Sequence, residues 1–331
     1  MNSVIMISMK KTIVIFGISS LVGSNLAEAL KHKYRIIGTY YNTKVQIDGV
    51  LCLPCDVLSR ETVQMILYKF QPEFTLYCVG LSSIEDCSEN MKLADALNTA
   101  GVFNVTNFSE RYKSKFIYIS SSYIFSGEDV LFKEGDTPLP NTDYGTTMSS
   151  AEFYIQKSCL NYLILRCCSL YGRGLNPNVR SWMELIEERL SSNQTLPCDN
   201  NVITGFLDIH FLAKVLDQCL EEDVTNRLFQ VSSSDFGTRY DFALKYSRIF
   251  GFGESLVVKS PWSFPINQLA ARDSVVLDGK YRFMMDTSNI HLHLGIKFPT
   301  IEEAINSTFE RLGGSDQKNG QSKGSTGITY I

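Results

Sequence analysis

The sequence lacks both a long hydrophobic run and an excess of positive charge. No stretch approaches the roughly 20 apolar residues that span a bilayer, which excludes a membrane-spanning helical protein. The 31 Lys and Arg residues are outnumbered by 35 Asp and Glu, for a net charge of −4. Because no basic surplus is left to bind a nucleic-acid backbone or an anionic membrane, we expect neither partner.

Cysteine and histidine are too scattered to form a framework. The nine cysteines are an odd number that includes the neighbours Cys167 and Cys168, which does not suit a disulfide scaffold and favours a reducing cytoplasm. Cys52 and Cys55 form a single CxxC, and the chain has four histidines. Because no second CxxC follows, we expect small apolar residues at a strand end rather than a metal or redox site.

The sequence does contain the composition and pattern of a globular α/β protein. Hydrophobic residues make up 44% and charged residues 20%. Short apolar runs alternate with helix-like stretches, which predicts a doubly wound parallel sheet covered by helices on both faces. The predicted strands are 12–16, 35–39, 74–79, 116–119, 163–167 and 228–231, and the predicted helices are 21–32, 60–68, 90–111, 149–157 and 211–221.

The alternation weakens after about residue 172, which divides the chain. We expect a first domain over residues 9–172, with a return segment at about 206–233. Residues 173–205 and 234–312 are irregular and predict a smaller C-terminal lobe that binds the substrate. Residues 313–331 are polar and glycine-rich without apolar periodicity, and we expect them to be disordered.

The first predicted strand runs into a glycine turn that opens a helix, with the spacing GxxSxxG. Gly17 permits a tight turn, Gly23 lets the helix pack close to the strand, and the helix N-terminus offers unpaired N–H groups to a pyrophosphate. Ser20 replaces the usual middle glycine. In this strand–turn–helix context the motif predicts a Rossmann-type dinucleotide site rather than a purely structural turn. The residues expected to contact the cofactor here are Gly17, Ser19, Ser20, Leu21, Val22 and Gly23.

The end of the second predicted strand bears on the choice of cofactor. An NAD-selective site usually places an acidic residue here to bind the ribose 2′-hydroxyl. The strand instead ends at Thr39 and Tyr40, and the nearest cation is Lys44. The sequence therefore favours NADP, with NAD as the alternative. Asp56, after the third apolar run, either contacts adenine or caps a turn or helix.

A second group of motifs carries a family resemblance. The strand 116–119 ends in SSSYIFSG (120–127), and TDYGTTM (142–148) precedes a helix. With these motifs the chain resembles the extended short-chain dehydrogenase/reductase family, most closely the branch of dTDP-4-dehydrorhamnose reductases and related nucleotide-sugar enzymes. The resemblance covers nearly all of residues 10–312. It also rests on VGLSSIEDCSEN (79–90), LILRCCSLYG (163–172) and FMMDTSNIHLHLGIKFPTIEEAI (283–305).

The resemblance implies roles for individual residues. Tyr144 matches the tyrosine that exchanges a proton with the reacting oxygen, and Ser121 matches the hydroxyl that hydrogen-bonds it. Both suit hydride transfer to a ketone, which develops negative charge on oxygen. A partly buried loop tyrosine and a strand-end serine are the structural alternatives. The cofactor contacts that the resemblance implies are Val79, Gly80, Tyr144 and Met148, and the substrate contacts are Ser82, Ser122, Tyr123 and Asn178.

One departure from the family pattern affects the predicted chemistry. The family has YxxxK, whose lysine holds the nicotinamide ribose and stabilises the tyrosinate, but Met148 stands at this position. A free tyrosine is ionised to only about one part in a thousand at pH 7, so an oxidation-first reaction suffers most from the loss. We therefore expect an NAD(P)-dependent reductase of a nucleotide-activated keto-sugar in deoxysugar or surface-polysaccharide biosynthesis.

Two alternatives stay open at this point. One is a nucleotide-sugar epimerase or dehydratase. The other is a non-catalytic, cofactor-binding regulatory subunit, because the regulatory subunit of methionine adenosyltransferase resembles the same reductases. The apolar stretch 98–108 fits either a homodimer face or packed core. Glu152 is expected to be a surface or structural helix residue, and Asp208 and His210 are expected at a helix cap.

Overall fold

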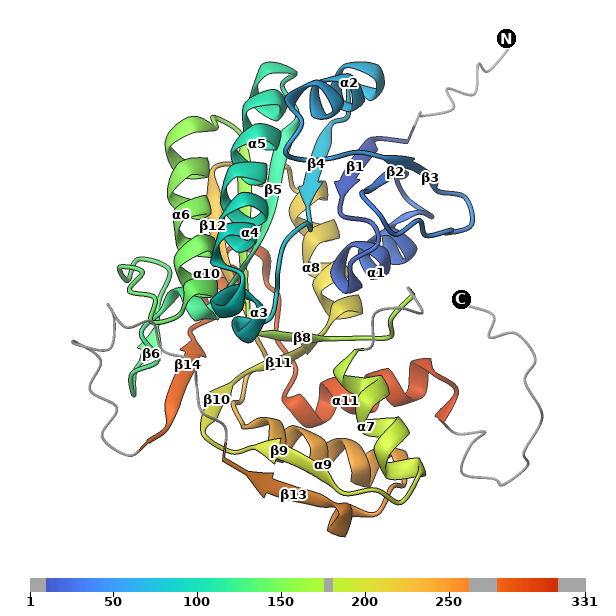
Figure 1. Cartoon of the computed structure of the whole chain (residues 1–331), viewed down its shortest axis with the longest axis vertical. Helices are drawn as coiled ribbons and strands as arrows, with labels where there is room; N and C mark the ends of the chain where they lie inside the picture. The colour runs from blue at the N-terminus through green and yellow to red at the C-terminus, as the bar shows by residue number, and fades with distance from the viewer. Residues whose placement is uncertain (1–9, 176–180, 262–278, 315–331) are drawn as a thin grey trace.

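The structure is a computed structural model that describes residues 10–175, 181–261 and 279–314. Its centre is a parallel sheet of seven strands (Figure 1). In order across the sheet these strands are β3 (Leu51–Pro54), β2 (Arg35–Tyr40), β1 (Thr12–Phe16), β4 (Phe74–Tyr77), β5 (Lys115–Ser121), β7 (Tyr162–Cys167) and β12 (Arg227–Val231). The prediction of an α/β fold with a Rossmann-type, doubly wound parallel sheet is confirmed.

Helices cover both faces of this sheet (Figure 1). On one face α5 (Gly101–Arg111) packs against both α2 (Arg60–Phe70) and α6 (Asp143–Ser158). On the other face α1 (Leu21–Leu30) packs against α8 (Ile209–Glu221). Because helices lie on both sides, all five residues of β1 are buried, as their unbroken apolar sequence predicts.

The strand order reverses at β1, and this reversal places the site. The strands β2 and β3 lie on one side of β1, while β4, β5, β7 and β12 lie on the other. The chain leaves the carboxyl ends of β1 and β4 in opposite directions, which opens a crevice between them. Ligands of open α/β sheets bind at this kind of crevice.

A smaller lobe stands beyond the carboxyl ends of these strands, in the lower half of Figure 1. It has its own hydrophobic cluster, in which Tyr171, Phe206 and Phe242 pack together. Two small sheets belong to this lobe: β8 (Ser169–Tyr171) with β11 (Phe206–Asp208), and β9 (Leu196–Asp199) with β13 (Val257–Ser260). A third small sheet, of β10 (Val202–Thr204), β14 (Tyr281–Met285) and β6 (Leu131–Phe132), contributes its buried residues to the main hydrophobic cluster. The helices of the smaller lobe are α7 (Trp182–Ser191), α9 (Arg239–Phe250) and α11 (Ile301–Arg311).

The predicted helices 21–32, 60–68 and 211–221 differ from the structure by two residues at one end, and the other two differ more. The stretch 90–111 is divided into α4 (Met91–Asp95), a π-helical turn (Ala96–Ala100) and α5, after the short α3 (Ile84–Glu89). The helix predicted at 149–157 begins earlier, at Asp143, because the Thr142 hydroxyl accepts a hydrogen bond from the Gly145 amide at 3.0 Å. Tyr144 therefore lies in the first turn of α6 rather than in a loop. The remaining short helices are Ser122–Ile124, Glu254–Leu256 and α10 (Ser288–Leu294).

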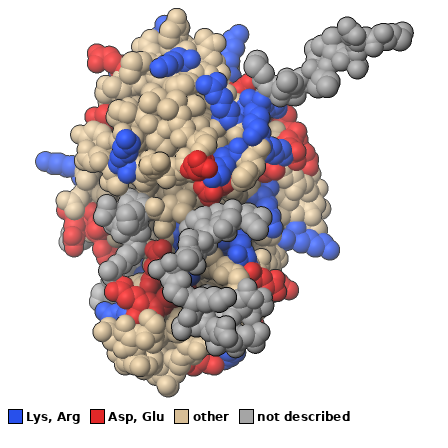
Figure 2. Space-filling model, turned by 90° about the vertical axis from the view of Figure 1, so that its right-hand side faces the viewer, with Lys and Arg blue, Asp and Glu red and all other residues tan. Residues whose placement is uncertain are grey.

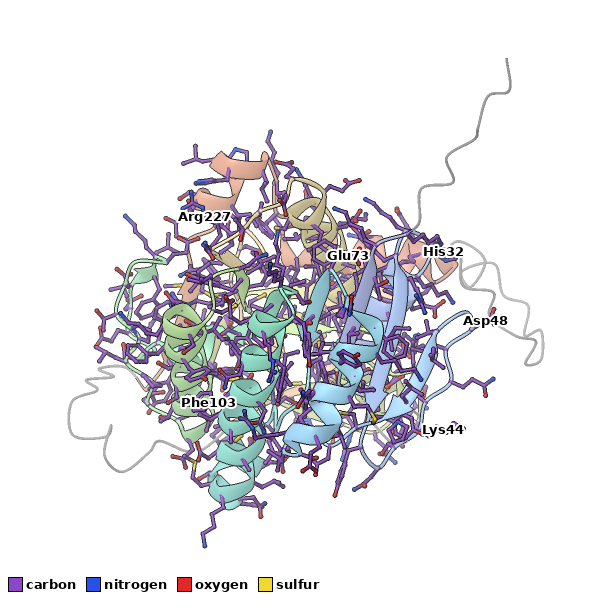
Figure 3. The ribbon with its side chains drawn as sticks, turned by 90° about the horizontal axis from the view of Figure 1, so that it is seen from above. His32, Lys44, Asp48, Glu73, Phe103 and Arg227 are labelled. Carbon is purple, nitrogen blue, oxygen red and sulfur yellow. The ribbon has the colours of Figure 1, made fainter. Side chains whose placement is uncertain are left out.

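The apolar stretch 98–108 contributes to the core and also has an outer side. Val102, Val105 and Phe108 are buried. Phe103, labelled in Figure 3, is half-buried and stacks on Tyr154 of α6, with ring centroids 3.8 Å apart. This packing accounts for the buried side of the stretch, and the homodimer stays a prediction.

The surface carries charges of both signs. On the face displayed in Figure 2, Lys and Arg side chains gather in the upper part, with Asp and Glu side chains beside them and farther down. Among the described residues, no helix has the length and apolar character needed to cross a membrane.

Candidate active site

A cavity of about 560 Å³ lies between the carboxyl ends of the central strands and the smaller lobe. The predicted site residues that line it are Ser20, Leu21, Val22, Val79, Gly80, Ser82, Ser121, Tyr123, Tyr144 and Met148. The predicted residues outside its lining are Gly17, Ser19, Gly23, Thr39, Tyr40, Asp56 and Ser122. Asn178 falls outside the described residues. The structure thus brings the predicted cofactor turn and the predicted catalytic pair to one cavity.

The glycine turn after β1 lies close to the backbone that follows β4. Gly17 has φ +89°, and a Cβ there would lie 2.6 Å from the Cys78 carbonyl at the end of β4. Ser20 caps α1: its hydroxyl accepts from the Gly23 amide at 3.0 Å and donates to the Gly17 carbonyl at 2.8 Å. The first turn of α1 carries no acidic residue. These features fit a pyrophosphate at the helix N-terminus.

The end of β2 supports the same turn from the side. The carbonyl of Thr39 accepts hydrogen bonds from the amides of Gly17 and Ile18, at 3.1 and 2.8 Å. Tyr40 is half-buried beside it, and Lys44 is exposed on the following loop, at the edge of the molecule (Figure 3). Among the described residues at the end of β2, from Gly38 to Asn42, none is acidic, as the sequence indicates.

Asp56 makes a local turn in the structure. Its carboxylate accepts a hydrogen bond from the Leu58 amide at 2.9 Å, and its carbonyl accepts from the Thr62 hydroxyl at 2.8 Å. This is the turn-capping alternative that the sequence left open. The side chain remains half-exposed, and a contact with adenine stays a prediction.

The loop after β4 is held by Asn98. Its Oδ1 accepts from the Leu81 amide at 2.9 Å, while its Nδ2 donates to the Leu81 carbonyl at 3.0 Å and to the Thr147 hydroxyl at 3.1 Å. Gly80 has φ +153°, and a Cβ there would collide with the Asn98 amide. Because Asn98 sits in the π-helical turn and Thr147 in α6, one buried amide fixes the cavity loop relative to the helix of Tyr144.

Tyr144 and Ser121, the predicted catalytic pair, both line the cavity. Tyr144 lies in the first turn of α6, and Ser121 is the last residue of β5. Burial raises the pKa of the Tyr144 phenol well above its usual value, although a hydrogen bond with the Ser121 side chain acts in the opposite direction. The phenol is therefore neutral at physiological pH. It can donate a proton to a ligand oxygen, but it is a poor base.

Met148 lies one helical turn after Tyr144 and is 7% exposed. Its sulfur accepts a hydrogen bond from the Tyr118 hydroxyl of β5 at 3.2 Å. Burial raises the pKa of Tyr118 well above its usual value, and the nearby Tyr144 adds to the rise. A thioether is a weak acceptor and carries no charge, so this position provides no cation to stabilise a tyrosinate.

The smaller lobe contributes the opposite wall of the cavity. Trp182 and Phe206 supply apolar surface, and Arg239 lies exposed at the rim with its guanidinium 5.6 Å from the Trp182 ring centroid. Arg239 is the one Lys or Arg that lines the cavity within the described ranges. Tyr123 packs edge-on against Tyr144, with centroids 6.1 Å apart, and burial raises the pKa of Tyr123 to about 12.

Several lining residues, among them Tyr118, Trp182 and Arg239, were not predicted from the sequence. For Tyr118 the sequence did contain a signal. Tyr118 lies two residues before Ser120, the first residue of the SSSYIFSG stretch, and so faces the same side of β5 as Ser120. No comparable signal exists for Trp182 and Arg239, which approach the cavity from distant parts of the chain. Ser122, which the family resemblance implies as a substrate contact, is instead 1% exposed behind the cavity wall.

Comparisons with known proteins agree with this geometry. The family model described as "RmlD substrate binding domain" matches residues 9–312. A probable low-salt glycan biosynthesis reductase of Haloferax volcanii is 24% identical over 292 residues, which cover 87% of this chain and 94% of that protein. The methionine adenosyltransferase 2 subunit beta of Danio rerio is 22% identical over 253 residues, which cover 75% and 76%.

Solved structures show the same fold. The dTDP-4-dehydrorhamnose reductase of Bacillus anthracis, in complex with NADP, has a TM-score of 0.74 and 19% identity, covering 91% of this chain and 99% of that one. The UDP-glucose 4-epimerase of Thermotoga maritima, with UDP-glucose, has a TM-score of 0.75 and 19% identity, covering 92% and 99%. Reductases and epimerases therefore share this architecture, and the side chains of the cavity must distinguish them.

Proposed function

Because the chain belongs to the RmlD substrate binding domain family, we propose that it is an NADP-dependent reductase of a nucleotide-activated keto-sugar. The observation that carries the proposal is the placement of Tyr144 and Ser121 together in the cavity at the strand ends, where burial raises the pKa of the phenol and favours its neutral form. The relative that acts in glycan biosynthesis supports a role in deoxysugar or polysaccharide synthesis. The nine free cysteines are consistent with a reducing cytoplasm as its compartment.

The cofactor would occupy the side of the cavity formed by the glycine turn. When bound, a nicotinamide dinucleotide supplies the hydride. The backbone from Gly17 to Gly23 would hold its pyrophosphate, Val79 and Gly80 would line its path, and Met148 would pack beside it. The lack of an acidic residue after β2 favours NADP over NAD.

The protonation state of Tyr144 favours reduction over the epimerase and dehydratase alternatives. As the ketone carbon accepts hydride, its oxygen takes the proton from the Tyr144 phenol, and the Ser121 hydroxyl stabilises the developing charge. An enzyme that begins by oxidising an alcohol needs the tyrosinate as a base. Burial and the absence of a cation at position 148 oppose that ionisation.

The rim of the cavity suits a nucleotide-linked substrate. Arg239, whose guanidinium lies 5.6 Å from the Trp182 ring centroid, lines the cavity and would pair with the diphosphate. Ser82 and Tyr123 line the same cavity as Arg239 and Tyr144 and would contact the sugar. Asn178, which lies outside the described residues, is a further substrate contact that the family resemblance implies. The homodimer likewise remains a proposal.

A direct activity test separates the reductase from the alternatives. Under anaerobic conditions, NADPH should be oxidised when the protein meets a competent nucleotide 4-keto-sugar, with loss of absorbance at the nicotinamide band. Binding of NADPH without oxidation of any sugar in the panel would instead favour a non-catalytic cofactor-binding subunit. Met148 and the likeness to the methionine adenosyltransferase subunit are the observations behind that second candidate.

A further inference from the structure

A buried ion pair lies behind the wall that carries Ser121. Glu152 of α6 and Arg166 of β7 are 1% and 3% exposed. The Arg166 Nε lies 3.1 Å from both carboxylate oxygens, and Nη2 donates to Oε2 at 2.8 Å. The Ser120 hydroxyl of β5 donates to Glu152 Oε1 at 2.5 Å. One carboxylate therefore joins a helix and two strands at the carboxyl end of the sheet.

Arg166 extends this network and is fully engaged by it. Its Nη1 donates to the Glu134 carbonyl at 3.1 Å, and its guanidinium lies 5.3 Å from the Phe125 ring centroid. None of these groups replaces the carboxylate of Glu152 as the counter-charge. Removal of that charge would leave a buried guanidinium unpaired.

The pair belongs to a series of three contacts between α6 and β5. Tyr144, Met148 and Glu152 are spaced by four residues and lie on one face of α6. Their partners on β5 are, in order, Ser121, Tyr118 and Ser120. The last contact involves the residue directly before Ser121. It therefore anchors the strand where the strand enters the site.

Stability alone does not account for this arrangement. Burying a carboxylate and a guanidinium costs desolvation energy that their attraction often only offsets, so an apolar pair would serve a stable core equally well. The bidentate hydrogen bonds between Arg166 and Glu152 are directional, and so they limit how far α6 can slide or rotate against β5 and β7. Small displacements at reacting groups reduce rates strongly.

We propose that Glu152 and Arg166 form a positioning pair that, through Ser120, holds Ser121 against the Tyr144 phenol. Glu152 and Arg166 lie outside the cavity lining, and Ser120 is the member of the network that reaches it. This proposal rests on the function proposed above, in which Ser121 and Tyr144 meet the reacting oxygen. It assigns Glu152 a role beyond the surface or structural one expected from its sequence position.

A spectroscopic test of the proposal requires no substrate. Tyrosines are labelled with ¹³C at Cζ, where the chemical shift reports hydrogen bonding to the phenol oxygen, and the Tyr144 signal is assigned by its loss in Tyr144→Phe. Ser121→Ala defines the shift of a phenol without its partner. We expect Ser120→Ala and Glu152→Gln to move the Tyr144 signal most of the way to that position. Ser120→Ala is a small change that keeps the test valid if Glu152→Gln folds poorly.

The smaller lobe offers a control of matched chemistry. Glu187 accepts from both Nη groups of Arg173, at 2.5 and 2.8 Å, and from the Tyr246 hydroxyl at 2.5 Å. Glu187→Gln should lower stability but leave the Tyr144 signal in place. A wild-type signal in folded Ser120→Ala and Glu152→Gln would overturn the proposal. An unchanged Tyr144 chemical shift in Ser121→Ala would also overturn the proposal, because it would show that Ser121 and the Tyr144 phenol are not in contact.

A kinetic comparison becomes possible once a sugar substrate is identified. Positioning predicts that Ser120→Ala lowers kcat about 10-fold and Glu152→Gln up to about 10²-fold, while KM for sugar and NADPH stays within about two-fold. A loss of kcat only in proportion to the unfolded fraction, as in Glu187→Gln, would contradict the positioning role. Because the spectroscopic arm runs without turnover, failure of the positioning pair is distinguishable from failure of the proposed reductase function.

Discussion

The Tyr118 hydroxyl donates a hydrogen bond to the Met148 sulfur, 3.2 Å away, where the YxxxK pattern of the resembled family places a lysine. The two side chains are buried and line the same cavity as Tyr144. A phenol and a thioether provide packing and a weak hydrogen bond but no charge. The site is therefore arranged to keep Tyr144 protonated.

The first prediction restores the charge. Met148→Lys places an ammonium one turn after Tyr144, so it should lower the pKa of that phenol and contact a bound cofactor ribose. We expect tighter NADPH binding by calorimetry, and a free energy of unfolding lower by about 1–3 kcal/mol without cofactor because the ammonium is buried. Met148→Leu is the control and should bind NADPH as the wild type does. Equal NADPH affinity in the lysine variant would place Met148 away from the ribose.

The second prediction concerns pH. Burial raises the pKa of Tyr144, so its acid form persists from pH 6 to well above pH 9. Reduction should show no decline over that range from ionisation of Tyr144, whereas the reverse oxidation should rise steadily with pH. Met148→Lys should move the oxidative profile to lower pH. Rate profiles in both directions measure this, and an oxidative rate that levels off near neutral pH in the wild type would refute a raised pKa.

The third prediction removes the proton donor. Tyr144→Phe should reduce turnover by about 10²-fold or more, a typical contribution of general acid catalysis, while NADPH affinity changes little. Ser121→Ala should cost less, because one hydrogen bond is lost and the acid remains. Tyr154→Phe is the control, since Tyr154 lies on the same helix but bonds Asn107 at 2.8 Å on the outer side. Steady-state kinetics would count against the assignment if Tyr144→Phe kept full activity.

The fourth prediction tests the glycine turn. Gly17→Ala would place a Cβ 2.6 Å from the Cys78 carbonyl in a residue with φ +89°. Strain of this kind costs on the order of 1–3 kcal/mol, so both thermal stability and dinucleotide affinity should fall. Gly135→Ala meets nothing within 4 Å and should leave both unchanged. Thermal melts with and without NADPH make the comparison, and similar behaviour of the two variants would argue against a tight turn at Gly17.

The fifth prediction concerns cofactor choice. The end of β2 presents Thr39 and Tyr40 rather than a carboxylate that would repel a 2′-phosphate. Calorimetric titration should therefore give a lower Kd for NADPH than for NADH. Tighter binding of NADH would contradict only the preference for NADPH. If neither dinucleotide bound, the prediction of a dinucleotide site would be wrong.

The sequence predicted those parts of the fold and site that depend on local patterns. Continuous apolar runs such as 12–16 indicate strands buried on both faces, and the turn from Gly17 to Gly23 has a spacing tied to its geometry. Asp208 likewise caps α8 as expected, accepting from the His210 amide at 2.6 Å. In each case the signal and the structure lie within a few residues of one another.

Other features depend on contacts that local patterns do not encode. The early start of α6 results from the Thr142 cap, and the π-helical turn brings Asn98 to the loop after β4. The pairing of Glu152 with Arg166 depends on β7 lying beside β5, which only the strand order reveals. Arg239 approaches the cavity from the other lobe. Long-range packing rather than propensity therefore decides which side chains share the site.

The most direct measurement of the central claim traces the hydride itself. The protein is incubated with NADPH carrying deuterium at the transferable position of the nicotinamide and with a nucleotide 4-keto-sugar, and the sugar is analysed by mass spectrometry. A working reductase places one deuterium on the former carbonyl carbon of the product, and Tyr144→Phe slows this transfer by about 10²-fold. If NADPH and the nucleotide sugar both bind but the sugar returns unreduced and free of deuterium, the protein is not a reductase of that substrate class.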